Sequence, residues 1–531
     1  MCHLPTTMSY RSVQRKIIST SSNLAAEDAR NSAKAFGFNN FESWLTTGGD
    51  DRSLIHKSTG TNKYYTTPKP INSTHIFRGS CTCNPPTSRG YNAARKLYED
   101  RIEGFQGVEL NDVLREIFAS QRDRLAAVMN LPRGCEIIIC PSGTDAEYIP
   151  IAIAKMLSPK DAQIRNGITQ LQEIGAGSAK AAMGEYFSSH SPLTGELPHG
   201  LTKLHGFEGI QSSAIPARTK NGEVIDAVEG MKEFMNETIA NGHYPIVHGV
   251  FGGKTGIRDE VMPPSLEGGR ESLGVVDACQ GRFTSAELIE WLEQDSLVLF
   301  SASKFFQAPP FCGAVIVPCT IADQLFHSNI TPKEMLTSNG LGAYLTDKEL
   351  PPCLNSWKNH LRDEGKNNIG LALRWEAGLI ALEQLASVSD EKRITNINAW
   401  SAAVTQMVNN ESQLEAWCSI HSIISIRVSN NNDGWLNMED CRHLFRLMSV
   451  DVSSAVPDAT EEEKVALSTI AYIGQPVSVC EDHAIVRMAL GVESLIAYID
   501  SKDATLMEDR MIVKKLALIS KHFCSLKGIS L

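Results

Sequence analysis

The sequence predicts an α/β protein built around a mainly parallel sheet. Two apolar runs, at 273–276 and 296–300, each have the length of a fully buried strand. Between them, residues 285–294 carry apolar side chains at helical spacing and begin with a serine, which favours a helix N-terminus. A strand, a helix and a strand in this order form a parallel crossover unit. We therefore expect both strands to end at the same edge of one sheet.

Side chains that can carry chemistry follow both of these strands. Asp277 and Gln280 come at the end of the first strand, and Lys304 follows the second. A buried lysine that has lost its charge is a nucleophilic amine, and a nearby carboxylate can hold a protonated pyridine nitrogen. The pair therefore indicates chemistry on pyridoxal 5'-phosphate (PLP). The alternative is an ion pair between Asp277 and Lys304 at the strand ends.

A third segment supports the cofactor interpretation. The apolar strand predicted at 136–140 leads into Ser142, Gly143 and Thr144, which open a helix reaching to about residue 156. Free backbone N–H groups and the helix dipole meet at such a turn, and glycine permits a close approach, so the turn is typical of an anion site. It precedes the strand of Asp277 by roughly 130 residues.

In this order the three segments resemble the fold-type I PLP enzymes, most closely the branch of class V aminotransferases, cysteine desulfurases and kynureninase. The resemblance covers roughly residues 100 to 320. It implies a mainly parallel seven-stranded α/β/α large domain, a smaller α+β C-terminal domain and a homodimer with shared active sites. We expect an N-terminal arm with helices at 1–104, the PLP-binding large domain at 105–345 and the small domain at 346–531.

The resemblance also implies roles for individual residues. Lys304 looks like the Schiff-base lysine, Asp277 like the partner of the pyridine nitrogen, and Gln280 like the partner of the ring hydroxyl. The expected cofactor-binding set is Ser142, Gly143, Thr144, Asp277, Gln280, Ser301, Ser303 and Lys304. No metal is expected.

The chain departs from the family pattern in two places. Many members place a histidine that stacks on the PLP ring after a strand-end glutamate, whereas this chain has Ile174 and a glycine turn. Ile174, Phe187 or a residue of the N-terminal arm is then expected against the ring. Ser303 stands where desulfurases have histidine. These departures support a competing hypothesis, a non-catalytic protein that retains the PLP fold.

Two arginines are candidates for the substrate. Arg487 lies in an apolar stretch near the C-terminus, where a buried arginine needs an anionic partner. Family members use an arginine in this part of the small domain to bind the substrate's α-carboxylate. The alternative for Arg487 is an ion pair with Glu493 or Asp482, and Arg78 in the N-terminal arm is the second candidate.

The expected function is that of a PLP-dependent enzyme acting on the α-amino group of an amino acid or a derivative, first of all an aminotransferase. A PLP-dependent lyase or β/γ-replacement enzyme is the alternative. Cysteine desulfurase chemistry is disfavoured because neither Cys353 nor Cys441 lies in an obvious mobile loop. Lys254 is a second lysine near the predicted site, interpreted as a solvated loop residue.

Composition limits the class of protein. The 531 residues are 42% hydrophobic and carry a net charge of -11, which fits a cytoplasmic small-molecule enzyme and disfavours a nucleic-acid surface. No apolar run is long enough for a membrane span. The 13 scattered cysteines indicate a reducing compartment and neither a disulfide framework nor a zinc site. The first 25 residues are basic and hydroxyl-rich, as in a flexible arm or a targeting segment.

Overall fold

The computed structural model describes residues 27–79, 84–197, 202–219, 222–259, 271–429, 434–479 and 484–529. The 25 N-terminal residues, for which the sequence leaves an arm or a targeting segment open, lie outside the described residues. Among the described helices, none combines the length and the apolar character needed to cross a bilayer.

The larger sheet has seven strands in the order β2-β10-β9-β8-β7-β3-β6. β10 runs antiparallel to β2 and β9, and the other neighbours are parallel, which confirms the predicted sheet. The strands are β2 (Glu136–Cys140), β3 (Ile164–Thr169), β6 (Gln211–Ile215), β7 (Tyr244–Val250), β8 (Leu273–Asp277), β9 (Leu297–Ser301) and β10 (Gly313–Val317).

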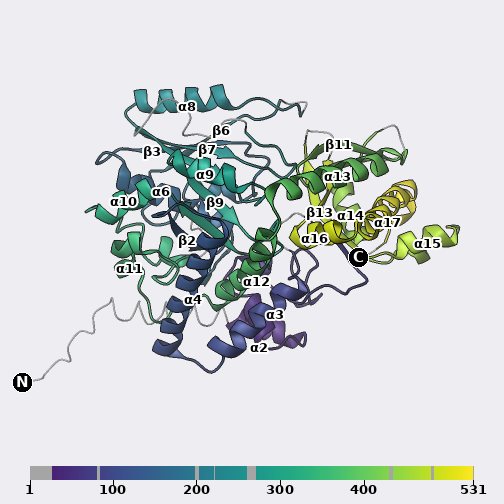
Figure 1. Cartoon of the computed structure of the whole chain (residues 1–531), viewed down its shortest axis with the longest axis horizontal. Coiled ribbons are helices and arrows are strands. Elements are labelled where there is room, and N and C mark those ends of the chain that lie inside the picture. Colours follow the sequence, from purple (N-terminus) through teal and green to yellow (C-terminus); the bar gives the residue numbers. More distant parts are fainter. Residues whose placement is uncertain are drawn as a thin grey trace, which may run out of the picture.

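Helices cover both faces of this sheet, giving the expected α/β/α layers (Figure 1). Alternate side chains of each strand point to opposite faces, so Ile138 belongs to one hydrophobic cluster while Ile137 and Ile139 belong to another. The covering helices are α4 (Gly107–Val128), α6 (Tyr148–Leu157), α8 (Val228–Ala240), α9 (Ser285–Glu293), α10 (Cys319–His327) and α12 (Ile369–Ala386).

A second sheet has five strands in the order β1-β13-β14-β12-β11. Its first strand comes from the N-terminal arm, where β1 pairs in parallel with β13. The arm, expected to be extended, therefore joins the C-terminal part of the chain. The strands are β1 (Ile76–Arg78), β11 (Leu414–Ile420), β12 (Ile423–Val428), β13 (Ala471–Ser478) and β14 (Ala484–Ala489).

Shorter elements and the C-terminal helices complete the chain. They are α2 (Asn40–Leu45), α3 (Ser88–Leu97), α5 (Gly143–Ala146), α7 (Ser178–Ala181), α11 (Asn355–Leu361), α13 (Asp390–Asn409), α14 (Met438–Met448), α15 (Glu461–Ser468), α16 (Val492–Asp500), α17 (Lys502–Lys521) and α18 (Phe523–Leu526).

Three local expectations need correction. The sequence predicts a strand at 169–174, but β3 ends at Thr169 because Gln170 takes a left-handed conformation with φ of 50°. The N-cap of α9 is Thr284 rather than Ser285, since Thr284 and Glu287 form a capping box. The loop-rich composition of residues 183–222 predicts a lid or an interface flap, but β6 in this stretch forms the edge of the main sheet.

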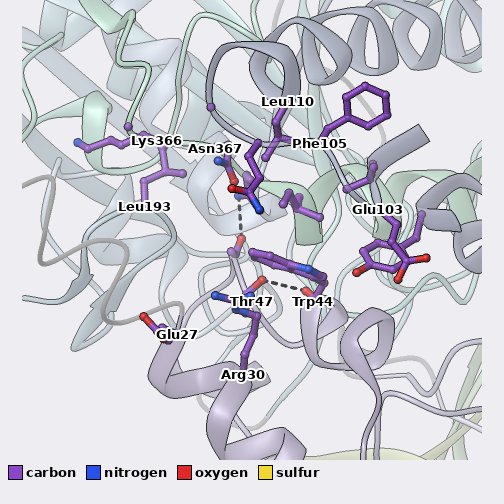
Figure 2. A pocket seen from close by; sticks show the side chains of 18 of the residues that line it. Glu27, Arg30, Trp44, Thr47, Glu103, Phe105, Leu110, Leu193, Lys366 and Asn367 are labelled. Atoms are coloured by element: carbon purple, nitrogen blue, oxygen red, sulfur yellow. Dashed lines mark hydrogen bonds between the residues drawn. The ribbon is translucent and has the colours of Figure 1, made fainter. Parts of the chain in front are cut away.

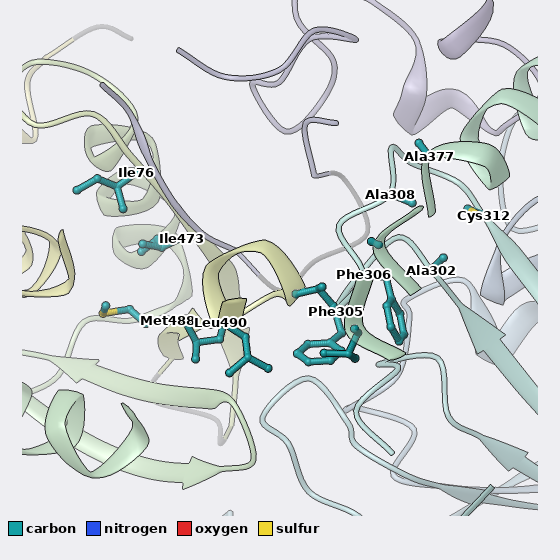
Figure 3. Packing of buried hydrophobic residues seen from close by; sticks show 14 of the residues in the cluster. Ile76, Ala302, Phe305, Phe306, Ala308, Cys312, Ala377, Ile473, Met488 and Leu490 are labelled. Atoms are coloured by element: carbon teal, nitrogen blue, oxygen red, sulfur yellow. The ribbon is translucent and has the colours of Figure 1, made fainter. Parts of the chain in front are cut away.

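The two sheets meet behind the turn that carries Lys304. Phe305 and Phe306 follow the lysine directly, and Figure 3 shows them beside Leu490, the residue after β14. The backbone N–H of Val492 donates to the carbonyl of Phe305 at 2.8 Å. The C-terminal part of the chain therefore packs directly against the strand end where the sequence places its chemistry.

Candidate functional site

Most of the predicted cofactor residues meet at one cavity at the carboxyl edge of the seven-stranded sheet. The residues that line it are Arg52, Ser142, Gly143, Thr144, Gly175, Ser178, Asp277, Cys279, Ser301 and Lys304. They come from the ends of β2, β8 and β9, from the turn before α7 and from the N-terminal arm. About 40 Å³ of open space remains between them, so long side chains such as Lys304 and Arg52 must swing aside to admit a ligand.

Lys304 stands three residues beyond the end of β9. The side chain of Asn84 donates hydrogen bonds to the carbonyl of Ser303 at 2.7 Å and to that of Lys304 at 3.1 Å. The N-terminal arm thus fixes the backbone of the lysine turn.

Asp277 ends β8 and is 7% exposed. Its Oδ1 accepts a hydrogen bond from the backbone N–H of Cys279 at 3.0 Å, which fixes the carboxylate at the strand end. Burial raises the pKa of the Cys279 thiol well above its usual range, and the charge of Asp277 raises it further. Cys279 is therefore a protonated thiol, and its side chain is not a nucleophile here.

Behind Asp277 lies a buried pair that the sequence analysis missed. Glu147 and His248 are 1% and 0% exposed, and Oε2 of the glutamate is 3.5 Å from Nδ1 of the histidine. Within the described part of the chain, neither ring nitrogen of His248 has a hydrogen-bond partner. A glutamate seven residues after a strand and a histidine inside an apolar strand carried no recognisable pattern.

Burial decides the charges of this pair. Burial raises the pKa of Glu147 well above its usual range, and the charge of Asp277 raises it further. Burial also lowers the pKa of His248 to about 3. A separation of 3.5 Å is too long for a strong ionic hydrogen bond, and two unsolvated charges would cost several kcal/mol. We therefore assign a neutral carboxylic acid and a neutral imidazole, which leaves Asp277 as the negative charge.

The predicted anion turn and the end of β9 line the cavity with hydroxyl groups. Ser301 Oγ lies 2.8 Å from Ser303 Oγ and 3.1 Å from the carbonyl of Cys312, and Ser142 Oγ accepts from the N–H of Asp145 at 3.1 Å. A Cβ added to Gly143 would come within 2.6 Å of Cys279 Sγ. Only glycine therefore fits this turn, as predicted for a close approach of backbone and ligand.

Arg52 brings a positive charge to the same cavity, which the sequence analysis did not foresee. It is held by the carboxylate of Asp50, with Nε 2.9 Å from Oδ1, and its guanidinium lies 4.6 Å from the ring centroid of Phe311. The arginine sits in the loop-rich N-terminal arm, where no local pattern distinguishes a ligand-binding arginine from a surface one.

Gln280 is oriented by a buried arginine. Nη1 of Arg282 donates to Oε1 of Gln280 at 2.7 Å, while Nε donates to Ser422 Oγ at 2.8 Å. Because Oε1 of Gln280 accepts this hydrogen bond, its Nε2 group is the part of the amide that can donate to a ligand. A ring oxygen requires such a donor as its partner. Arg282 thus links the cofactor strand to the C-terminal sheet.

Arg487 lies at the junction of the two sheets rather than on a remote surface. Its Nη1 donates to the carbonyl of Lys254 at 2.9 Å and its Nε to that of Gln475 at 3.0 Å. Asp482, one of its alternative partners, lies outside the described residues. Glu493 is the other alternative partner of Arg487, and the positive charge that acts on its carboxyl group is that of Arg89.

Arg78 is not placed for substrate. Its guanidinium binds Asp509 at 2.7 Å and Glu508 at 2.9 Å, both on α17, and the side chain is 3% exposed. Arg78 therefore holds β1 on the C-terminal helices and is not placed to bind substrate.

Lys254 was interpreted as a solvated loop residue, but its side chain is held by the protein. Its Nζ donates to the carbonyl of Gln172 at 2.9 Å, and burial lowers its pKa to about 8.

Neither side chain proposed to stack on the ring lines the cavity. Ile174 packs in a small apolar cluster with Ile168 and Val250, and Phe187 packs on Tyr148 with ring centroids 6.3 Å apart. Gly175 and Ser178 are the lining residues of this segment.

The sequence matches no family model, and no curated protein is significantly similar to it. Solved structures are similar in fold. Tryptophan decarboxylase from Catharanthus roseus, in complex with L-tryptophan, is 14% identical over 88% of this chain and 85% of that chain, with a TM-score of 0.50. Oryza sativa TDC with PLP and tryptamine is 14% identical over 83% of each chain (TM-score 0.47). Cysteine desulfurase CsdA from Escherichia coli is 11% identical over 82% and 96% (TM-score 0.49).

The chain has the fold of the fold-type I PLP-dependent enzymes. At these identities the likeness establishes the fold and not the reaction.

The donor set around the cavity fits PLP. A phosphate group could accept hydrogen bonds from the hydroxyl groups, the glycine turn and Arg52. Asp277 could pair with a protonated ring nitrogen, and Lys304 could bond to a carbonyl carbon. These groups converge on one cavity although they lie up to about 250 residues apart in the sequence.

A more spacious cavity lies elsewhere and has none of this chemistry. It measures about 510 Å³ and is bounded by α2, the α3–α4 turn and the segment before α12. Figure 2 shows Trp44 and Arg30 on one side and Leu110 and Phe105 on another, and the Arg30 guanidinium is 4.0 Å from the Trp44 ring centroid. The candidate active site is therefore chosen by its side chains and not by its size.

Proposed function

We propose that this protein is a PLP-dependent enzyme that acts at the α-amino group of an amino acid. The observation that carries the proposal is the meeting of Lys304, Asp277, Ser142, Gly143, Thr144 and Ser301 around one cavity. When bound, PLP supplies an electron sink that stabilises negative charge at the substrate's Cα. The ion-pair alternative is disfavoured, because Asp277 and Lys304 form no ion pair within the described residues.

Each residue has a defined task in this proposal. Lys304 binds the cofactor's carbonyl carbon and later moves the proton at Cα. Asp277 keeps the ring nitrogen protonated, and the neutral state of Glu147 leaves that carboxylate as the negative charge beside it. Gln280 donates to the ring oxygen. Ser142, Thr144, Ser301 and Arg52 hold the phosphate, with Ser303 supporting Ser301.

Arg487 is the proposed anchor of the substrate's α-carboxylate. A guanidinium that binds this carboxylate through two parallel hydrogen bonds keeps it in place while the Cα–H bond is broken. We therefore propose transamination as the first candidate reaction. We expect the active unit to be a homodimer.

Decarboxylation is the second candidate, favoured by the fold likeness to tryptophan decarboxylase. In this case the bond from Cα to the carboxylate is broken, so the carboxylate must lie away from a binding arginine. A lyase or β/γ-replacement reaction uses the same residues with a substrate that carries a leaving group.

A panel of amino acids, added to the PLP-loaded protein, tests the proposal. Release of a keto acid without ammonia indicates transamination, CO2 indicates decarboxylation, and a keto acid released together with ammonia indicates elimination. We expect Asp277→Asn to retain PLP while slowing exchange of the Cα proton by orders of magnitude, because the ring nitrogen loses its proton. Unchanged exchange would remove Asp277 from its proposed role.

A further inference from the structure

Two cysteines come together at the edge of the seven-stranded sheet opposite the candidate active site. Cys135 directly precedes β2, and Cys319 begins α10 two residues after the end of β10. β2 and β10 are antiparallel neighbours, and Glu136 pairs with Val317. One step further along this ladder, Cys135 faces the residue that precedes Cys319. Strand pairing therefore makes neighbours of two cysteines that lie far apart in the sequence.

Two observations place the side chains of these cysteines in contact. Burial raises the pKa of the Cys135 thiol to about 11, whereas a hydrogen bond from the backbone N–H of Cys319 lowers it and the charge of a Cys319 thiolate raises it. The sulfur of Cys135 therefore faces the backbone nitrogen of Cys319. Gly134 has a φ of 91°, and a Cβ added to it would come within 3.2 Å of Cys319 Cβ. The side chain of Cys319 thus begins directly beside the residue that precedes Cys135.

A rotation of one side chain is enough to bring the two sulfurs together. Only Cα and Cβ separate the sulfur of Cys319 from its own backbone nitrogen, and two of the three staggered χ1 rotamers hold the sulfur close to that nitrogen. The sulfur of Cys135 already faces the same nitrogen. A bond between the sulfurs therefore requires no rearrangement of β2 or β10.

The two thiols differ in their access to solvent. Cys319 is exposed, whereas Cys135 is half-buried and packs against the largest hydrophobic cluster. Because oxidation of a thiol depends on access, an oxidant in solution reaches Cys319 first. Cys135 then stands beside the oxidised sulfur as a second thiol that can react with it.

We propose that Cys135 and Cys319 are a redox-sensitive pair, which hydrogen peroxide converts into a disulfide that ties the start of β2 to the start of α10. In the first step the sulfur of Cys319 attacks one oxygen of the peroxide. The O–O bond breaks, an S–O bond forms, and the leaving hydroxide takes up the thiol's proton as water.

The second step forms the disulfide. The sulfur of Cys135 displaces the hydroxyl group from the sulfur of Cys319, and this group leaves as water with the proton of the Cys135 thiol. The two thiols together lose two electrons, and the peroxide is reduced to two molecules of water. A dithiol reductant reverses the bond, so the pair stays reduced in a reducing compartment and closes only on oxidation.

The disulfide would close a loop that contains every strand from β2 to β10. Such a cross-link limits the freedom of the unfolded chain and so stabilises the folded one. Neither cysteine lines the cavity that holds Lys304, so the same disulfide should form with and without bound PLP.

Peptide mapping without reductant, after brief treatment with hydrogen peroxide, tests the inference. We expect a cross-linked species that joins the peptides of Cys135 and Cys319, lacks two hydrogen atoms and disappears when dithiothreitol is added. The cross-linked protein should also melt at a higher temperature than the reduced protein. Two unmodified thiols, sulfinic acid on Cys319 beside a free Cys135 thiol, or a melting temperature that does not rise would overturn the inference.

Single substitutions assign the two roles. In Cys319→Ser, Cys135 should remain a free thiol, because the exposed sulfur that reacts first is missing. In Cys135→Ser, Cys319 should stop at the sulfenic acid, which dimedone traps, or continue to the sulfinic acid. Cys524→Ser removes another exposed cysteine and is the matched control, so it should keep the wild-type cross-link. Oxidation of Cys135 at the wild-type rate in Cys319→Ser, or a missing cross-link in Cys524→Ser, would contradict the assignment.

Discussion

Buried arginines at two places in this protein have opposite surroundings. At the edge of the C-terminal sheet, Arg78 meets two carboxylates, Asp509 at 2.7 Å and Glu508 at 2.9 Å. At the junction of the two sheets, the described hydrogen bonds of Arg282 end on neutral oxygens, and its charged neighbour is Arg487. The first arginine is therefore paired with carboxylates inside the folded chain, whereas neutral groups hold the second.

The difference separates an arginine that forms buried ion pairs from an arginine that neutral groups hold at the junction where Arg487 is proposed to bind substrate. Removing one member of a buried ion pair leaves the other charge buried without a partner, so the substitution lowers the free energy of unfolding. Removing an arginine that neutral groups hold leaves no unpaired charge behind, so we expect the cost when the anionic ligand binds. The following predictions test this distinction, beginning with the largest effect.

Arg78→Leu should lower the free energy of unfolding by about 3–5 kcal/mol, because it leaves Asp509 buried beside Trp400 without its cation. Burial raises the pKa of Asp509, so a folded variant binds a proton that the unfolded chain releases. The loss should therefore grow as pH rises from about 4 to 7. Chemical denaturation at both pH values measures it.

Glu508→Gln is the matched control for Arg78→Leu. The side chain of Glu508 is 53% exposed, so we expect a change below about 1 kcal/mol. A loss as large as that of Arg78→Leu would contradict the assignment of Asp509 as the principal partner.

Arg487→Lys should weaken substrate binding by roughly tenfold to a thousandfold while leaving the melting temperature and the cofactor band nearly unchanged. Lysine keeps the charge but cannot form two parallel hydrogen bonds with a carboxylate. Substrate titration and thermal melting of the same preparation separate the two effects. Lost stability with full affinity would make Arg487 a structural residue like Arg78.

Glu147→Gln should raise the stability of the cofactor-free protein by on the order of 1–3 kcal/mol at pH 8. The pKa of Glu147 is raised by burial and by Asp277, so the folded protein keeps a proton that the unfolded chain releases above about pH 4.3. The wild type therefore loses stability as pH rises. The glutamine variant does not, because its side chain has no proton to release in this range. The gain should shrink as pH approaches 4.

Melting curves of wild type and Glu147→Gln at pH 4.5 and pH 8 measure this gain. If Glu147 instead forms a charged pair with His248, the same variant would strand a buried imidazolium and be less stable at both pH values. That result would contradict the neutral assignment of the pair.

Much of the cofactor end could be predicted from the sequence because its signals are local. Asp277, Lys304 and the Ser142–Gly143–Thr144 turn each follow a short apolar strand, and parallel strands bring their carboxyl ends to one edge. The seven-stranded α/β/α sheet was implied by the family that these segments resemble.

The contributions of distant segments could not be predicted in the same way, because their contacts join residues far apart in the chain. Arg52 reaches the cavity from the N-terminal arm, and Arg282 acquires its surroundings from β14 and the β11–β12 turn. Arg78 was chosen for its place in the arm, yet β1 pairs with β13 and carries it away from the cavity to α17. Such pairings depend on tertiary packing and leave no local pattern.

The central claim is that Lys304 carries PLP, and covalent mapping tests it most directly. The protein is incubated with PLP, reduced with borohydride, digested and analysed by mass spectrometry for the pyridoxyl group. Our account predicts the modification on the peptide that contains Lys304 and its loss in Lys304→Ala. Modification of Lys254 instead, or no site-specific modification, would contradict the account.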